Sequence, residues 1–410
     1  MRHMYDMRCE EELLEALVRY EENDERGALA ETCYDLGYYY QEAGDMQRAT
    51  AHYRRSLVLC EALGTRRESA RAYWRLGLVF EMNGDLEQAR FYLREALEIS
   101  QRIDDVAGTV RAQGALAFLH LVGGYLDEAE QGFSAALAGA EQAGEIELQA
   151  EMHANLAQVE LGHGNRVGAE GQHRESLRLY QQNGDERGEA GQYRCLGMLS
   201  MQSRDSEVSK AYIDRARQIH ERSDYAIGLG LVCESEAEWL RTSGDWSAAE
   251  EKCQQALRHF ECAGHLGKIS SVRLSLARYM ARGGDMDGAC LQLEQALAHY
   301  EEVDDRDGIA RTCKKLGDIY WQQTAGEMDR GEQMYRRALD VYQLVGDERG
   351  SGAAYVGLGK AAVKRGERTQ AVAMWSAASE LLRKNGCDDE VEQLQGAIRQ
   401  IWSGGDIQVA

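Results

Sequence analysis

Apolar residues recur along this chain at spacings that predict pairs of amphipathic helices. In one stretch they stand at positions i, i+3, i+4 and i+7, namely Tyr73, Leu76, Gly77 and Phe80. This spacing places them on one face of a helix. A second stripe follows a Gly-Asp pair and consists of Ala89, Leu93, Ala96 and Leu97. The pattern therefore predicts two helices joined by a tight turn.

The same pattern returns every 40 residues. The Gly-Asp pair stands at 44–45, 84–85, 244–245 and 284–285, and looser versions occupy 124–125, 164–165 and 204–205. An insertion of two residues within 324–330 then moves the pattern to 326–327 and 366–367. The sequence thus contains nine repeats, each predicted to be a helical hairpin.

The predicted turn within each repeat has a definite chemistry. Glycine supplies the left-handed residue that ends the first helix, and the Asp after it can accept from the bare N–H groups of the second. Gln88, three residues after Asp85, completes a capping-box pattern. Proline, which breaks helices, is absent from all 410 residues, while glycine occurs 43 times. We therefore expect an all-α protein.

Two slots of the second helix hold small residues in every repeat. The first slot contains Ala49, Ala89, Ala129, Ala169, Ser209, Ala249, Ala289, Gly331 and Ala371. The second contains Ser56, Ala96, Ala136, Ser176, Ala216, Ala256, Ala296, Ala338 and Ala378. Small side chains allow neighbouring helices to approach closely. Because one hairpin cannot bury its apolar stripe alone, each must pack on the next, and the product is an α-solenoid.

These repeats resemble tetratricopeptide (TPR) repeats. The family pattern W-x2-L-G-x2-Y…G-D…A-x3-F-x2-A is matched in repeat two by Tyr73, Leu76, Gly77, Phe80, Gly84, Asp85, Ala89, Leu93 and Ala96. Repeat nine matches through Tyr355, Leu358, Gly359, Gly366, Ala371, Trp375 and Ala378. The resemblance implies a right-handed superhelix of about nine hairpins.

The chain departs from the TPR pattern in two respects. The family's closing proline is missing, and the period is 40 residues instead of 34. This long form is similar to kinesin light chains, spindle-orientation adaptors and bacterial Rap-type regulators. We expect an N-terminal capping helix in 1–24, the TPR array in 25–385, and a C-terminal capping helix with a short disordered tail in 386–410.

Composition and charge disfavour some classes of binding partner and indicate the compartment. The net charge of −22 disfavours general binding to nucleic acid or to anionic membranes. No signal peptide or membrane-spanning stretch is recognisable, and the ten cysteines stand singly, which is typical of reduced thiols. These features predict a soluble cytoplasmic protein that does not insert into membranes.

Signals for catalysis or cofactors are weak. The sequence has no nucleotide-binding glycine loop, no HExxH and no GxSxG. One group, Cys253, His259, Cys262 and His265, has spacings that zinc ligands also show, but Cys253 occupies a core slot. The column of Cys33, Cys233 and Cys313 shares its slot with Ala72, Ala112 and Val272, which indicates packing. We therefore expect no enzyme activity, no metal and no cofactor.

Repeats five and six break the pattern. Glu236 stands where other repeats have leucine, and Arg204 takes the place of the turn glycine. A buried unpaired carboxylate is costly, so either the helix rotates to let Glu236 reach water, or the solenoid has a flexible joint there. The sequence leaves both interpretations open.

The TPR resemblance implies that a partner lies along the concave groove lined by the first helices. The slots that line it near the start hold Tyr34, Tyr38, Trp74 and Leu78. The middle slots hold Phe118, Leu121, Val122, Asn155, Gln158, Leu161, Arg194, Met198 and Met201. The last slots hold Arg278, Arg282, Arg311, Lys314, Lys315, Trp321, Lys360 and Lys364.

Four of the eight lysines fall in the last of these slots, which predicts a local positive patch. Asp318 and Glu332 are acids that can neutralise it. Two ligand modes of the family fit poorly. Asp318 stands where a carboxylate clamp needs asparagine, and the slot of the asparagine ladder of spindle adaptors holds asparagine only at Asn155.

We therefore expect a non-enzymatic scaffold or adaptor that binds a peptide or helix with acidic residues in its groove. The alternative is a signalling regulator whose superhelix changes conformation when a peptide binds. Rap-type proteins act broadly in this way but carry an N-terminal helical effector domain, whereas only about one helix is predicted before repeat one. The identity of the partner and the oligomeric state stay open.

Overall fold

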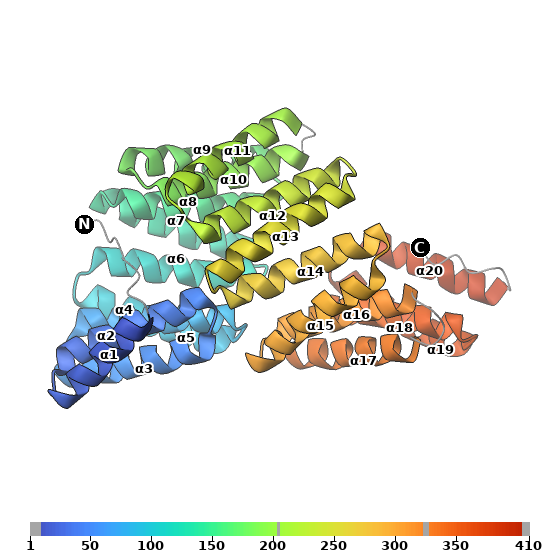
Figure 1. The fold of residues 1–410 in the computed structure, drawn as a ribbon, viewed down its shortest axis with the longest axis horizontal. Helices are drawn as coiled ribbons and strands as arrows, with labels where there is room; N and C mark the ends of the chain where they lie inside the picture. Colours follow the sequence, from blue (N-terminus) through green and yellow to red (C-terminus); the bar gives the residue numbers. More distant parts are fainter. Residues whose placement is uncertain (1–9, 203–205, 323–327, 404–410) are drawn as a thin grey trace. The chain divides into compact units, whose positions relative to one another are not determined.

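The computed structural model describes residues 10–202, 206–322 and 328–403, and these form helices joined by short turns, with no strand (Figure 1). The helices divide into two compact units, Met1–Gly267 and Lys268–Ala410. The boundary falls in the first turn of α14, in repeat seven, and not at repeats five and six. The flexible joint expected near Arg204 and Glu236 stays a prediction, since residues 203–205 lie outside the described part.

Unit 1 contains α1(Glu10–Glu22), α2(Arg26–Ala43), α3(Met46–Leu63), α4(Arg66–Met82), α5(Leu86–Arg102), α6(Val106–Val122), α7(Leu126–Ala143), α8(Ile146–Gly162), α9(Arg166–Asn183), α10(Glu186–Gln202), α11(Ser206–Arg222), α12(Ala226–Thr242) and α13(Trp246–Cys262). The remaining helices are α14(Leu266–Gly283), α15(Met286–Glu302), α16(Arg306–Gln322), α17(Met328–Val345), α18(Glu348–Lys364), α19(Arg368–Lys384) and α20(Asp388–Ser403). The even-numbered helices α2 to α18 are the first helices of the nine predicted repeats, and the odd-numbered helices α3 to α19 are the second helices.

Left-handed residues end the helices at intervals of 20 residues, half the repeat. Within the first repeats they are Asp24, Gly44, Gly64 and Gly84, with φ between 53° and 83°. The turn between repeats is therefore built like the turn within a repeat. Asp85 caps α5 by accepting from the Gln88 N–H at 3.1 Å, as expected. The capping box does not close, because the Asp85 N–H donates to the Phe80 carbonyl at 2.9 Å.

The Leu-Gly pair of the first helix allows a large residue of the second helix to approach. A Cβ placed on Gly77 would lie 2.5 Å from Leu93, and one on Gly359 would lie 2.2 Å from the Trp375 ring. Leu93 and Trp375 are fully buried. In these two repeats glycine is therefore required by packing, since a Cβ would displace Leu93 or Trp375, whereas four other repeats hold a buried alanine in the same slot (Ala117, Ala157, Ala237 and Ala277).

Both small-residue slots are buried throughout the two units, as predicted. Where serine replaces alanine, its hydroxyl is satisfied by a carbonyl of a first helix. Ser56 donates to Ala30 at 2.8 Å and Ser176 donates to Ala150 at 2.7 Å. Because the buried serine hydroxyl keeps a hydrogen bond, serine can take the place of alanine in this slot.

The hairpins stack in chain order within each unit. Every first helix from α4 to α12, and again α16 and α18, contacts both the preceding and the following helix of its own unit. First helices of adjacent repeats also contact one another, at α4–α6, α6–α8 and α10–α12 in unit 1 and at α16–α18 in unit 2. Contacts between second helices of adjacent repeats are sparser among the described residues. The first helices therefore lie on the inner, more closely spaced side of each unit.

A terminal helix covers the exposed face of the first and last repeats. Leu13 of α1 is buried in the cluster formed by α2 to α4. Val391, Leu394, Ala397 and Ile401 of α20 are buried against α19. The C-terminal tail beyond Ser403 lies outside the described residues.

Glu236 is neither exposed nor unpaired. Its side chain is 15% exposed and forms ion pairs with Arg217 of α11 and with Lys252 of α13, the latter at 2.9 Å. The Arg217 Nε also donates to the second carboxylate oxygen at 3.1 Å. Arg217 itself stands in a slot that holds leucine in seven other repeats. Two adjacent leucines of the repeat are thus replaced by an acid and a base that neutralise each other.

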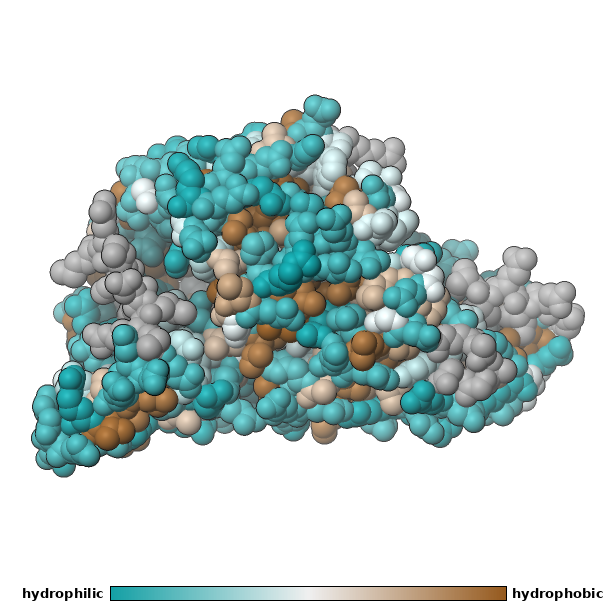
Figure 2. Space-filling view, in the orientation of Figure 1, coloured by the Kyte–Doolittle hydropathy of each residue, from teal (hydrophilic) through white to brown (hydrophobic). Residues whose placement is uncertain are grey.

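The surface is mostly polar. On the face drawn in Figure 2, hydrophilic residues predominate and hydrophobic side chains emerge in small groups. Among the described residues, no helix is both long enough and apolar enough to cross a membrane.

Candidate functional site

The candidate site is the surface formed by the first helices, which we call the inner surface of each unit. The slots assigned to the groove from the sequence all lie on first helices. Their exposure differs along the chain. Tyr34 is buried, and the half-buried members are Tyr38, Trp74, Leu78, Phe118, Leu121, Asn155, Arg194, Met198, Met201, Lys314, Lys315, Trp321 and Lys360. Gln158, Arg278, Arg282, Arg311 and Lys364 are exposed.

At the start of unit 1 the inner surface is a cluster of aromatic rings and arginines. The Arg75 guanidinium lies 4.7 Å from the centre of the Tyr38 ring and 4.8 Å from that of Trp74. It also donates to the Tyr34 hydroxyl at 3.1 Å. Arg71 lies 4.4 Å above the Tyr34 ring. Both guanidinium groups therefore contact aromatic rings of the protein itself, whose faces attract positive charge.

Acidic groups of the same inner surface have raised pKa values. Burial raises the pKa of Glu42, against the opposing effect of Arg75 and Arg187. Burial, with a smaller contribution from Glu147, raises the pKa of Glu151 to about 7. Unit 1 therefore places both signs of charge on its inner surface, and one carboxyl titrates near neutral pH.

The basic residues at the end of unit 2 are used in different ways. Lys314 forms an ion pair with Asp318 at 2.8 Å, so Asp318 neutralises this lysine as anticipated. Lys360 and Lys364 lie over the Trp321 ring, 5.9 Å and 5.2 Å from its centre, and Lys364 donates to the Trp321 carbonyl at 3.1 Å. Three of the four lysines therefore contact groups of the protein itself.

Glu332, the second acid considered, does not neutralise a lysine of this surface. It forms ion pairs with Arg336 at 2.6 Å and with Arg365. Arg311 is paired with Asp307 one turn away, at 2.7 Å.

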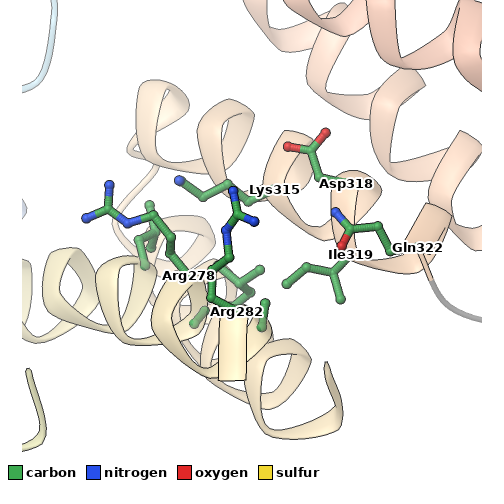
Figure 3. Close-up of a pocket in the computed structure, with 10 residues that line it drawn as sticks. Arg278, Arg282, Lys315, Asp318, Ile319 and Gln322 are labelled. Carbon is green, nitrogen blue, oxygen red and sulfur yellow. The ribbon is translucent and has the colours of Figure 1, made fainter. Parts of the chain in front are cut away.

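The fourth lysine, Lys315, lines a pocket of about 450 Å³ between α14 and α16 (Figure 3). Its polar walls are Arg278, Arg282, Lys315, Asp318 and Gln322. Its apolar lining is Leu274, Ala277, Ala281, Leu293 and Ile319. In Figure 3, Lys315 and Arg278 extend toward the same side, and Arg282 rises between Lys315 and Gln322. The pocket thus combines three cations and one carboxylate with a hydrophobic lining.

The electrostatics of this pocket favour an anion. Burial lowers the pKa of Lys315, and the positive charges of Arg278 and Lys314 lower it further. Asp318 is the opposing influence, but its carboxylate already accepts from Lys314 at 2.8 Å and from the Tyr335 hydroxyl at 2.9 Å. An incoming anion would stabilise the charged form of Lys315.

Sequence reasoning missed part of this arrangement. It assigned Arg278, Arg282 and Lys315 to the groove, but it did not separate them from Lys314, Lys360 and Lys364. It also left out Arg75, which lies in the same slot as Lys315, directly before the Leu-Gly pair. A comparison of that slot in all repeats would have identified Arg75, since arginine and lysine occupy it only at these two positions.

The sequence offered one set of residues with zinc-like spacing and one column of cysteines as possible metal or redox groups. The zinc-like set does not come together among the described residues, where the one cluster of metal-binding side chains is Asp127, Glu130 and His163, all exposed. Cys253 is buried, as its core slot predicted. Burial raises the pKa of Cys33 to about 12 and that of Cys313 to about 11, so both thiols stay protonated at neutral pH, in agreement with a packing role.

Comparison with protein-family models matches residues 10–102 to the tetratricopeptide repeat. The hairpins and the small-residue slots continue this pattern through the later repeats. Residues 10–102 therefore match the TPR family in sequence, and the later repeats share their helical-hairpin fold. No curated protein matches its sequence.

Solved structures with a similar fold include Rap proteins and a protein with a tetratricopeptide repeat sensor. A Rap conjugation gene regulator of plasmid pLS20 in complex with the Phr* peptide has a TM-score of 0.54 at 14% identity, over 68% of this chain and 75% of the other. A Rap protein complexed with competence and sporulation factor has a TM-score of 0.50 at 14% identity, over 82% and 98%. At such identities the likeness establishes the fold alone.

A third similar structure is a STAND protein (Signal Transduction ATPase with Numerous Domains) with a tetratricopeptide repeat sensor, from Pyrococcus horikoshii. Its TM-score is 0.52 at 13% identity, over 76% of this chain. The chain spans about half of that protein, 52% of its length.

Proposed function

We propose that this TPR protein is a non-enzymatic interaction scaffold that holds a peptide or helix of a partner on the inner surface of its repeats. The observation that carries this proposal is the pocket of Arg278, Arg282 and Lys315, which opens on the inner surface of unit 2. A protein with a net charge of −22 concentrates cations there, beside an apolar lining. Such a surface favours the binding of partner segments in which acidic residues stand next to apolar residues.

The inner surface of unit 1 supports contacts of a different kind. Half-buried Phe118, Met198 and Met201 supply apolar and adaptable side chains, and Asn155 and Gln158 supply amide groups. A partner segment that binds this surface would gain apolar burial there.

Peptide display tests the proposal. A random peptide library is selected on the full chain, and in parallel on the variant Lys314→Glu with Lys315→Glu. We expect the natural chain to enrich peptides with Asp or Glu next to apolar residues, and the variant to lose that acidic preference. Selection without acidic enrichment, or with the same enrichment on both proteins, would contradict the proposal.

A second candidate function is a signalling regulator that changes conformation when a peptide binds. The specific observation in its favour is that two of the similar structures are Rap proteins, one in complex with the Phr* peptide and one with competence and sporulation factor. Small-angle scattering with a selected peptide separates the two candidates. A change in the radius of gyration of the full chain on saturation favours the regulator, and an unchanged radius favours the scaffold.

A further inference from the structure

A second pocket of unit 2 lies on the side of the second helices, between repeats eight and nine. It has a volume of about 260 Å³ and is lined by residues of α17, α18 and the start of α19. Its apolar lining consists of Leu339, Tyr355, Leu358, Ala362 and Met374. Its polar lining consists of Glu332, Arg336, Glu367 and Gln370. This pocket shares no lining residue with the pocket between α14 and α16.

The slot of Ala362 holds an aromatic residue in three other repeats. Ala362 stands four residues after Leu358, the leucine of the Leu-Gly pair. In repeats one, two and eight the same slot contains Tyr40, Phe80 and Tyr320. Repeat nine is the one repeat in which the sequence has alanine there. A ring-sized volume is therefore missing from the first helix of repeat nine.

Phe80 shows what a ring in this slot does. It stacks on Tyr92 of α5, with 5.2 Å between the ring centres and 4° between the ring planes. On its other side, the Arg54 guanidinium of α3 lies 5.5 Å from the centre of the Phe80 ring. The ring of the first helix thus lies between the second helices of two successive repeats.

Tyr320 has the same position between repeats seven and eight. Its hydroxyl donates to Glu294 of α15 at 2.9 Å, and Arg330 of α17 lies 5.4 Å from its ring centre. Tyr40 contacts the helix before repeat one, since its hydroxyl donates to Glu10 of α1 at 2.6 Å. An aromatic side chain is therefore the group that the protein itself uses in this groove.

The groove between repeats eight and nine retains the surroundings of such a ring. Arg336 stands in the slot of Arg54, and Met374 stands in the slot of Tyr92. The Arg336 guanidinium donates to Glu332 at 2.6 Å. An arginine can bind a carboxylate through its N–H edge while its face lies on an aromatic ring, and a methionine sulfur also packs well against rings.

The size of the pocket fits a single ring. A cavity of roughly 150 Å³ with an apolar lining accommodates benzene, and this pocket is larger, at about 260 Å³. The equivalent groove between repeats five and six has a pocket of about 250 Å³, but four of its lining residues are charged, namely Lys210, Asp214, Glu236 and Lys252. An uncharged ring would desolvate those charges, so the groove between repeats eight and nine is the better site for it.

We propose that the pocket between α17 and α19 binds a phenylalanine or tyrosine side chain of a partner protein, which takes the place of the ring missing at Ala362. This inference goes beyond the proposed function, because it adds a docking site on the side of the second helices. It does not depend on peptide binding to the inner surface.

Small uncharged probes test the site on the full chain. N-acetyl-phenylalaninamide represents an aromatic side chain within a peptide, and N-acetyl-leucinamide represents an aliphatic one. Binding is measured by ligand-observed saturation-transfer NMR titration. We expect the phenylalanine probe to bind at least roughly threefold more tightly, because its ring covers more apolar surface and lies against the Arg336 guanidinium.

Variants that restore the missing ring locate the binding. Ala362→Phe introduces the residue of repeat two and should lower the affinity for the phenylalanine probe at least roughly tenfold, since the ring then lies in the pocket. Met374→Tyr, which introduces the residue in the slot of Tyr92, provides a second variant that fills the pocket. The matched control is Ala373→Phe, because Ala373 is exposed, does not line the pocket and shares its slot with the exposed Phe91.

A further variant tests the contribution of the cation. Arg336→Met should remove most of the preference for the phenylalanine probe over the leucine probe, while Glu332 keeps its ion pair with Arg365. Circular dichroism and thermal melts verify that every variant is folded.

Tighter binding of the phenylalanine probe, lost in Ala362→Phe or Met374→Tyr and kept in Ala373→Phe, supports the site. Equal binding of the two probes overturns it, as does binding that persists in both filled variants. A dimer of the natural chain that only the filled variants convert to a monomer would overturn the partner and assign the pocket to a second copy. Peptide display on the Lys314→Glu with Lys315→Glu variant reports on the inner surface, so failure of the proposed function is observed separately.

Discussion

The inner surfaces of the two units are built from the same repeat but handle charge differently. In unit 1, Arg71 and Arg75 lie on the protein's own aromatic rings, and Glu236 is enclosed by Arg217 and Lys252. In unit 2, Arg278 likewise lies 5.0 Å from the centre of the Tyr279 ring and donates to its hydroxyl at 3.2 Å, whereas Lys315 lines a pocket whose one carboxylate is already hydrogen bonded. The comparison teaches that a repeat scaffold fixes where side chains emerge, and the residue in one slot, Arg75 or Lys315, decides whether its charge lies on the protein's own rings or at a pocket.

The ion pairs of Glu236 should give the largest effect on stability. Glu236→Leu restores the leucine of the repeat but leaves the partly buried Arg217 with only the exposed Glu221 at 3.9 Å, and we expect a loss of about 3 kcal/mol in the free energy of unfolding. The double variant Glu236→Leu with Arg217→Leu should recover most of that loss, since both repeat leucines are then present. Urea denaturation of the two single variants and the double variant measures the coupling. Additive losses would show that the two residues do not compensate for each other.

Arg75 should be the next most important residue. Arg75→Met removes its contacts with Tyr38 and Trp74 and its hydrogen bond to Tyr34, and we expect a loss of about 2 kcal/mol. Lys315→Met, in the same slot of unit 2, should not destabilise the protein, because its lowered pKa shows that the charged form is disfavoured by folding. Urea midpoints of the two variants compare the units directly. Equal losses of stability in the two variants would show that Arg75 and Lys315 do not differ in how far their contacts stabilise the folded protein.

Reversing charge in unit 2 should reduce binding more than stability. The double variant Lys314→Glu with Lys315→Glu should lower the affinity for an acidic peptide selected by display at least roughly tenfold, because electrostatic attraction becomes repulsion. The dependence of its affinity on salt should also become smaller, since fewer opposite charges remain to be screened. Fluorescence anisotropy with a labelled peptide at several NaCl concentrations measures both. Affinity that falls with salt as steeply as in the natural chain would contradict the charge contribution.

The last prediction concerns the carboxyl of unit 1 that titrates near neutral pH. The folded pKa of Glu151 is about 7, above its ordinary value, so between about pH 4.5 and 7 the folded state binds more protons than the unfolded state. Stability contributed by the protonated form is therefore lost as pH rises through this window. Glu151→Gln should be more stable than the natural chain at pH 8, by about 3 kcal/mol at most, and nearly equal at pH 4. Thermal melts at both pH values test this, and an equal difference at the two would exclude Glu151 as the cause.

Much of the fold could be predicted from particular residues. Gly84 and Asp85 predicted a turn, and Leu93 and Ala96 predicted the buried face of a helix. The structure confirms the turn and the buried face. The half-period of 20 residues was missed, because aspartate replaces glycine as the left-handed residue at Asp24, Asp104, Asp224 and Asp304. The interpretation that Glu236 reaches water was wrong, because it pairs with Arg217, and the presence of Arg217 in a leucine slot was the sequence signal for this partner.

The sequence by itself determined the helical hairpins, their period and the face on which each side chain emerges, because these follow from local periodicity and turn chemistry. It placed all the candidate residues on first helices. Only the tertiary structure decided that Lys360 and Lys364 cover Trp321, and that Lys315 meets Arg278 and Arg282 across a pocket. The physical reason is that partners on different helices depend on the spacing between those helices and on side-chain conformation, which periodicity along one helix does not specify.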